Sequence, residues 1–286
     1  MEIGVNILNF GPHATPSGLE SWTAFAETSG LGFAMISDHV AVTPDVAAQY
    51  PAPFYDPFTT LAWLAGRTSR IMLGTTVAVL PYRHPLHTAR VTANLAELSG
   101  GRLILGVGTG WSPLEYAALD VPFDGRGRAT DDHLRTIIDA WTHDEIIHNG
   151  QTVSTAPRPT PPPPVWVGGD SAPAVRRAAR FGDAWHPLFA SPAWLRESGL
   201  PALREAAAAA GRPVPALAPR IRIHRTETSL ASRDPGQGDT AQIRDDIEGY
   251  RSLGATHLLL DTYLGDPATI RTPEEDQAVL AELLDL

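Results

Sequence analysis

A histidine beside a carboxylate follows one of the first apolar runs of the chain. The stretch "SDHV" places Asp38 and His39 directly after the apolar residues 33–37. A histidine next to a carboxylate can be held in one tautomer and can exchange a proton near neutral pH. The pair therefore predicts an acid–base group at His39. The alternative, which is commoner for an isolated pair, is an aspartate that caps a loop and a histidine in a structural network.

A second acidic side chain lies close to a glycine-rich turn. Glu115 follows "GTGWSP" by two residues, so it could be a second acid or a contact to a substrate. The alternative is a solvated residue on the outside of a helix.

The glycine-rich turn itself, "LILGVGTGW", does not fit a dinucleotide-binding motif. Gly106, Gly108 and Gly110 alternate instead of following G-x-G-x-x-G, and the apolar run before them is the fourth in the chain. Alternating glycines leave the backbone without Cβ atoms on one face, which would let a flat ring or a ribityl chain approach. The alternative is a tight turn at a corner of the sheet.

A glycine pair follows the fifth apolar run, in "VWVGGDSAPAV". Gly168 and Gly169 have no side chains, so their backbone N–H groups would be accessible to a ligand. The helix that begins near Ser171 directs its positive end to the same place. This pattern predicts a phosphate site that needs no lysine. The alternative is a plain turn into a helix, capped by Asp170 or Ser171.

Several reaction types are excluded by what the sequence lacks. Cysteine is absent and all 22 basic residues are arginine, so the chain has no thiolate chemistry and no Schiff-base lysine. No G-x-S-x-G motif occurs, and His84 and His87 lack the spacing and carboxylates of a metal site, so we expect no metal. The net charge of −10 argues against nucleic acid as a partner. Without a membrane span or a signal peptide, we expect a soluble, cytoplasmic protein acting on small molecules.

Eight apolar runs would position these groups. Their residues do not alternate with polar ones, which is typical of parallel strands covered on both faces. Helical patterns separate most of them, including one introduced by a capping box at Ser17 and Glu20 and one that begins at Pro85. Eight such alternations in one chain of this length predict a single (β/α)₈ barrel domain over residues 1–286. The runs are 3–8, 33–37, 71–79, 103–107, 165–168, 184–187, 220–224 and 257–261.

Two segments exceed a minimal barrel. Residues 111–164, which end in "PRPTPPPPVW", and residues 226–240 both follow strands. In a barrel they would lie over the carboxyl-terminal mouth as a lid or as substrate-recognition elements. The proline run by itself fits a rigid spacer.

Taken together, the motifs resemble those of the bacterial luciferase-like superfamily of flavin and deazaflavin enzymes. The resemblance is closest to the branch that uses coenzyme F420. It rests on four ordered stretches that cover nearly all of residues 1–190, and more weakly on the final strand and helix. These stretches are "SDHV", "LGTTVAVLPYRHPLHTARVTANLAELSGGRLILGVGTGW", "EYAALDVPFDGRGRATDDHL" and "PPPVWVGGDSAPAVRRAARFGDAWHP".

The resemblance implies a (β/α)₈ barrel with the cofactor at its carboxyl-terminal mouth and a role for each matched residue. Asp38 and His39 would contact the deazaflavin ring, with His39 as the acid–base group. Thr76 and Val77 match a bulge that often contains a non-proline cis peptide behind the ring. The turn Gly108, Thr109 and Gly110 would follow the ribityl chain, and Gly168, Gly169 and Ser171 would hold the phosphate.

The implied reaction is hydride transfer between F420 and an electron-poor C=C, C=N or C=O group, in either direction. The alternatives are an FMN-dependent monooxygenase on the same barrel and, more remotely, a non-catalytic flavin-binding or deazaflavin-binding protein. Trp111 stands where sugar-phosphate dehydrogenases of the superfamily have a catalytic glutamate, which argues against a sugar phosphate. Trp111 and Tyr82, together with Trp22, instead predict an aromatic substrate pocket. A homodimer is expected from the resemblance.

Overall fold

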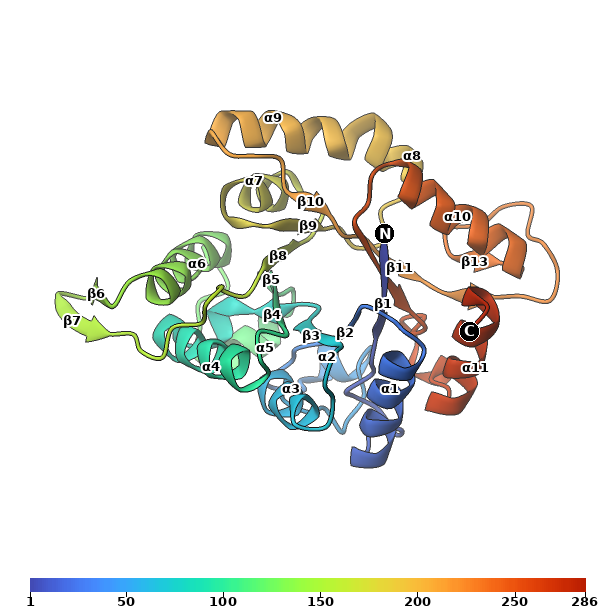
Figure 1. The fold of residues 1–286 in the computed structure, drawn as a ribbon, viewed down its shortest axis with the longest axis horizontal. Coiled ribbons are helices and arrows are strands. Elements are labelled where there is room, and N and C mark those ends of the chain that lie inside the picture. Colours follow the sequence, from blue (N-terminus) through green and yellow to red (C-terminus); the bar gives the residue numbers. More distant parts are fainter.

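The computed structural model describes all residues 1–286 as an α/β fold built on one large parallel sheet (Figure 1). All eight predicted apolar runs contain a strand of this sheet, so that part of the prediction is confirmed. The third run is interrupted between β3 and β4 by Thr76 and Val77, whose peptide bond is cis. The sheet strands are β1 (Glu2–Asn6), β2 (Phe33–Ile36), β3 (Met72–Thr75), β4 (Ala78–Val79), β5 (Leu103–Gly108), β8 (Val165–Gly168), β9 (Ala184–His186), β10 (Ala216–Leu217), β11 (Arg220–Arg222) and β14 (His257–Asp261).

The sheet curls, and its order is β10-β9-β8-β5-β3-β2-β1-β14-β11, with β4 paired to β5. Every pairing in it is parallel, with register pairs such as Val5 with Ala34 and Gly106 with Trp166. The strands at the two ends of this order, β10 and β11, are separated in sequence only by Ala218 and Pro219. All carboxyl ends therefore lie at one edge of a curled parallel sheet, where loops from distant parts of the chain meet.

Apolar side chains cover both faces of the sheet, which explains the lack of alternation in the sequence. Along β2, Ala34 and Ile36 join a core cluster of 49 residues beneath the outer helices. Phe33 and Met35 point the other way, into a smaller cluster inside the curl. Gly4 is required beside this inner cluster, because a Cβ there would lie 2.4 Å from the Phe33 ring.

Helices surround the sheet on its outer side (Figure 1). Helix α4 begins at Pro85 as predicted, but α1 is capped by Thr15, which accepts from the Gly18 amide, and not by a Ser17–Glu20 box. No helix is long and apolar enough to cross a membrane. The α-helices are α1 (Pro16–Thr28), α2 (Pro44–Ala47), α3 (Pro57–Ala65), α4 (Pro85–Leu98), α5 (Pro113–Ala118), α6 (Arg126–Thr142), α7 (Ala172–Phe181), α8 (Pro192–Trp194), α9 (Leu200–Ala210), α10 (Thr240–Ser252) and α11 (Pro273–Leu284).

Residues 111–164 do not act as one lid. Helix α6 packs beside α4 and α7 as an ordinary outer helix. The hairpin of β6 (Glu145–His148) and β7 (Gln151–Ser154) projects from the edge of the molecule (Figure 1). Only the part near Trp111 borders the mouth of the sheet. The second segment, 226–240, holds β13 (Gln237–Gly238), which pairs with β12 (His224–Arg225).

Candidate active site

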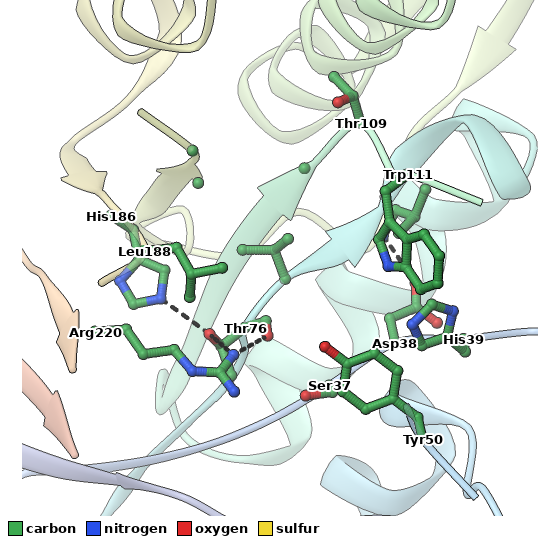
Figure 2. A pocket seen from close by; sticks show the side chains of 16 residues that line it. Ser37, Asp38, His39, Tyr50, Thr76, Thr109, Trp111, His186, Leu188 and Arg220 are labelled. Atoms are coloured by element: carbon green, nitrogen blue, oxygen red, sulfur yellow. Dashed lines mark hydrogen bonds between the residues drawn. The ribbon is translucent and has the colours of Figure 1, made fainter. Parts of the chain in front are cut away.

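A pocket of about 280 Å³ lies at the carboxyl ends of the strands (Figure 2). In this view His39, Asp38 and Trp111 form one side, while Thr76, His186 and Arg220 form the other. Most residues predicted to bind a cofactor line this one pocket, although they are spread along the sequence from Asp38 to Gly169. The full lining is Ser37, Asp38, His39, Tyr50, Thr76, Val77, Val79, Gly108, Thr109, Gly110, Trp111, Gly168, Gly169, His186, Leu188 and Arg220.

His39 is held by Glu115 and not by its sequence neighbour Asp38. Nδ1 of His39 lies 2.6 Å from Oε2 of Glu115, and the same oxygen accepts the hydroxyl of Tyr82 at 3.0 Å. The other oxygen of Glu115 accepts the amides of Val40 and Ala41 at 2.6 and 3.0 Å. Because an ionised carboxylate only accepts, Nδ1 of His39 carries the proton. Nε2 has no partner in the protein and remains free for a ligand.

Glu115 is fully buried, yet it remains ionised. Burial acts to raise the pKa of this carboxyl, but the hydrogen bond and charge of His39 and the amides of Ala41 and Val40 outweigh it, so the pKa is lowered. Burial and the Glu115 charge also raise the pKa of Tyr82, which keeps its phenol protonated as a donor. Glu115 bonds to His39 but is not among the residues that line the pocket, so it lies behind the histidine.

Asp38 has both oxygens engaged by other groups. Arg83 donates to Oδ2 at 2.7 Å and to Oδ1 at 2.8 Å, and the Val79 amide donates to Oδ2 at 2.8 Å. Burial acts to lower the pKa of Arg83, but its bonds to Asp38 and Asp56 raise it. Asp38 thus ties the loop after β2 to β4 and is not a free acid or base.

The opposite side of the pocket is a fully hydrogen-bonded network. His186 is bonded through Nδ1 to the Ala218 carbonyl at 2.6 Å and through Nε2 to the Thr76 hydroxyl at 2.9 Å. Burial, with a further contribution from the Arg220 charge, lowers the pKa of His186 to about 4. Arg220 reaches the Thr76 carbonyl at 3.0 Å and pairs with Asp261 at 2.6 Å. This network fixes the bulge between β3 and β4 from behind.

The alternating glycines make room mainly for the protein itself. A Cβ at Gly106 would lie 1.9 Å from the Thr75 carbonyl oxygen, and one at Gly108 would lie 2.5 Å from a Val77 methyl group. Val77 also closes the space beside Gly168, at 2.9 Å. The interpretation that this missing Cβ space admits a ligand is therefore wrong for Gly106 and Gly108. Instead, the glycines let the Val77 bulge form one wall of the pocket.

The predicted phosphate turn leads into a helix as expected, but the backbone amide of Gly169 is not free. Gly169 has φ +97°, and its amide donates to the His186 carbonyl at 3.3 Å. Of the two caps considered, Ser171 is the N-cap of α7, since its hydroxyl accepts from Ala174 at 3.4 Å. Ser171 is exposed and lies outside the pocket lining, next to the amino end of α7.

Three aromatic predictions receive different placements. Trp111 lines the pocket, is 41% exposed and has its ring 5.8 Å from that of His39. Tyr82 lies behind Glu115 and is not among the residues that line the pocket, so its role as a substrate contact stays a prediction. Trp22 belongs to α1 and is buried in the core.

Among the pocket residues that sequence reasoning missed, three have titratable side chains. His186 and Arg220 lie in runs recognised only as strands, and Tyr50 lies in the loop after α2. A polar residue at the carboxyl end of a parallel strand was the available signal for His186, whereas Arg220 is the first residue of β11 and lacked that signal. Tyr50 carried no such signal, because nothing in the local sequence shows that its loop folds over the sheet.

Comparison with known proteins identifies relatives over the full chain. A family model described as luciferase-like monooxygenase matches residues 1–283. An uncharacterised protein of Mycobacterium tuberculosis is 33% identical over 177 residues, which are 56% of this chain and 61% of that protein. An F420-dependent glucose-6-phosphate dehydrogenase of Beutenbergia cavernae is 32% identical over 263 residues, 87% of this chain and 72% of that one. The chain spans about 60% of the length of several other curated relatives.

Solved structures with the same fold have diverse activities. Monooxygenase RslO1 from Streptomyces bottropensis superimposes with a TM-score of 0.79 at 20% identity, covering 99% of this chain and 98% of that one. The coenzyme F420-dependent tetrahydromethanopterin reductase of Methanopyrus kandleri gives 0.75 at 18% identity, with the same coverage. At these identities the likeness concerns the fold alone.

Proposed function

The chain belongs to the luciferase-like monooxygenase family, and we propose that it is an F420-dependent oxidoreductase acting on a small organic substrate. The observation that carries this proposal is the free Nε2 of His39, which faces the pocket while Glu115 fixes the rest of the ring. The F420-dependent relative at 32% identity supports the choice of cofactor. Within this proposal the sheet closes through residues 216–222 as a (β/α)₈ barrel in one domain, and two copies associate as a homodimer.

The residues present fit a deazaflavin with a phosphorylated side chain. Val77 forms an apolar wall whose backbone is fixed by Thr76, His186 and Arg220, which suits the face of a flat ring. The turn Gly108, Thr109 and Gly110 leads from this wall toward the rim. At the rim, the turn through Gly168, Gly169 and Ser171 leads into the amino end of α7, whose positive end suits a phosphate, while the Gly169 amide is already bonded to the His186 carbonyl.

When bound, F420 would supply or accept the hydride. His39 performs the matching proton transfer at Nε2. In the reducing direction the substrate carbon gains a hydride and the neighbouring oxygen, nitrogen or carbon gains the proton from Nε2. In the reverse direction Nε2 takes that proton. Glu115 is a positioning residue, because it sets the tautomer and the orientation of His39 without touching the substrate.

The second candidate is an FMN-dependent monooxygenase. The monooxygenase with a TM-score of 0.79 favours it at the level of fold. Reduced FMN reacts with oxygen, whereas a reduced deazaflavin does so poorly, so oxygen uptake separates the two.

The test is a titration of the purified protein with F420 and, separately, with FMN, followed by tryptophan fluorescence. Trp111 beside His39 is the reporter, and Trp111→Phe controls for signals from the six other tryptophans. We expect saturable quenching by F420 and substrate-dependent oxidation or reduction without oxygen uptake. Preferential binding of FMN with oxygen consumption would overturn the proposal, as would binding of neither.

A further inference from the structure

Arg222 presents a guanidinium group without an acceptor on β11, the strand that also carries the pocket residue Arg220. It lies on β11, its Cζ atom is 4.1 Å from the centre of the Phe189 ring, and its Nε is buried without a partner. On another side it packs against Gly265, where a Cβ would lie 2.8 Å from Nη2. Five donors of a permanent cation are thus held between an aromatic ring and bare backbone.

The neighbouring arginines each have a carboxylate partner, which Arg222 lacks, although the Nε of Arg225 is also buried without a partner. Arg220 pairs with Asp261 at 2.6 Å, and Arg225 lies 3.4 Å from Glu282. Arg222 takes part in no salt bridge, although acidic residues outnumber basic ones in the chain by 32 to 22. A half-buried cation without a counter-ion is unfavourable unless something else supplies the negative charge.

Arg222 belongs to the same side of the mouth as the pocket residues Arg220 and Tyr50. It follows Arg220 by two positions along the strand, so both side chains leave on the same face, and both guanidinium groups lie within 6 Å of the Phe189 ring. Burial raises the pKa of Tyr50, while the charges of Arg220 and Arg222 both act against that rise. The Tyr50 hydroxyl has no partner in the protein and points into the pocket (Figure 2).

We propose that Arg222 and the Tyr50 hydroxyl bind a carboxylate of the substrate at the rim, opposite the glycine turn that receives the cofactor phosphate. This inference rests on the proposed function and names its substrate class: a monoanionic carboxylic acid that also carries the group reduced or oxidised near His39. One uncompensated positive charge matches one negative charge, which favours a carboxylate over a phosphate dianion. The carboxylate would accept charge-assisted hydrogen bonds from a guanidinium held in place by Phe189.

The test uses benzoate and its neutral analogue benzamide as probes. Calorimetric titration of the F420-saturated protein at constant ionic strength should show benzoate binding at least 10-fold more tightly than benzamide. In Arg222→Gln we expect the affinity for benzoate to fall about 10-fold or more, with that for benzamide unchanged. Arg225→Gln is the matched control, because it removes a nearby arginine that already has Glu282 as a partner.

Three results would overturn the inference. Equal affinities for benzoate and benzamide would show that no anion subsite exists. An equal loss in Arg225→Gln would reduce the effect to general electrostatics. Displacement of benzoate by F420, or a loss of F420 affinity in Arg222→Gln, would assign Arg222 to the cofactor.

The titrations are repeated without cofactor, so failure of the F420 proposal leaves a separate signature. In that case benzoate would still discriminate between the two arginine variants while F420 fails to bind.

Discussion

Two histidines line the same pocket from the ends of two strands, and their surroundings give them opposite properties. His39 uses one nitrogen to bond the Glu115 carboxylate and leaves the other free. His186 uses both nitrogens, one on the Ala218 carbonyl and one on the Thr76 hydroxyl. The partner of His39 is a charged carboxylate, whereas the two partners of His186 are neutral and that ring is buried beside the Arg220 cation. The residue type is the same and both histidines lie near the carboxyl end of a strand, so the hydrogen-bond partners decide which histidine can transfer a proton.

The largest expected effect concerns His186 and stability at low pH. Its pKa falls from about 6.5 in the unfolded chain to about 4 in the folded one, so the folded state resists protonation. The contribution of neutral His186 to the free energy of unfolding is therefore fully present above pH 6.5. It is lost as the pH falls toward 4, which lowers the free energy of unfolding by about 3 kcal/mol. Urea unfolding from pH 7.5 to 4 should show a weaker pH dependence in His186→Gln than in the unmodified protein. Equal pH dependence in both would remove His186 as the cause.

The next effect concerns His39 and catalysis. His39→Ala removes the only free imidazole nitrogen of the pocket, so we expect the rate of hydride transfer to fall about 100-fold or more. The affinity for F420 should change little, because the ring and phosphate contacts remain. Single-turnover absorbance of the cofactor measures the rate, and fluorescence titration measures the affinity. An unchanged rate would leave His39 with a binding role only.

Much of the fold was predictable because it depends on local patterns. Runs such as 103–107 and 257–261 are apolar on both faces, and each became a strand of the parallel sheet. The cap at Ser17 failed because Thr15 lies two residues earlier and competes for the same turn. The prediction that residues 111–164 lie over the mouth did not hold for α6. Its packing against α4 and α7 is a long-range property that length and composition do not reveal.

The parts of the site that depend on a local backbone motif could be predicted from the sequence. The parts that depend on hydrogen-bond partners distant in the sequence could not. Gly168 and Gly169 stand next to the helix they serve, so one stretch of sequence shows both. The partner of His39 is 76 positions away, and the adjacent Asp38 suggested a pairing that Arg83 prevents. The placement of Tyr50 and Arg222 could not be predicted, because it depends on how their loop and strand fold relative to the other strands.

A smaller effect is expected at the carboxylate that distinguishes the two histidines. Glu115→Gln keeps the shape and the acceptor for Val40 and Ala41 but removes the negative charge beside His39. We expect about a 10-fold loss of hydride-transfer rate with unchanged F420 affinity, because the amide NH2 that replaces Oε2 cannot accept from Nδ1 of His39 and no longer holds its tautomer. The lowered pKa of Glu115 means that its charge persists below pH 4.5 in the unmodified protein. A parallel loss of rate and affinity would instead indicate general disruption of the site.

The smallest effect should come from the hydroxyl of Tyr82, which donates to the Glu115 oxygen that also holds His39. Tyr82→Phe removes one of four hydrogen bonds to that carboxylate and leaves its charge in place. We expect the hydride-transfer rate to change about threefold, equivalent to ~0.6 kcal/mol. Tyr250→Phe is the control, because its buried hydroxyl donates to the Ala190 carbonyl away from the pocket. Both variants should lose similar stability in urea, and only Tyr82→Phe should alter the rate. Equal rates in the two would confine the support of His39 to Glu115 and its backbone contacts.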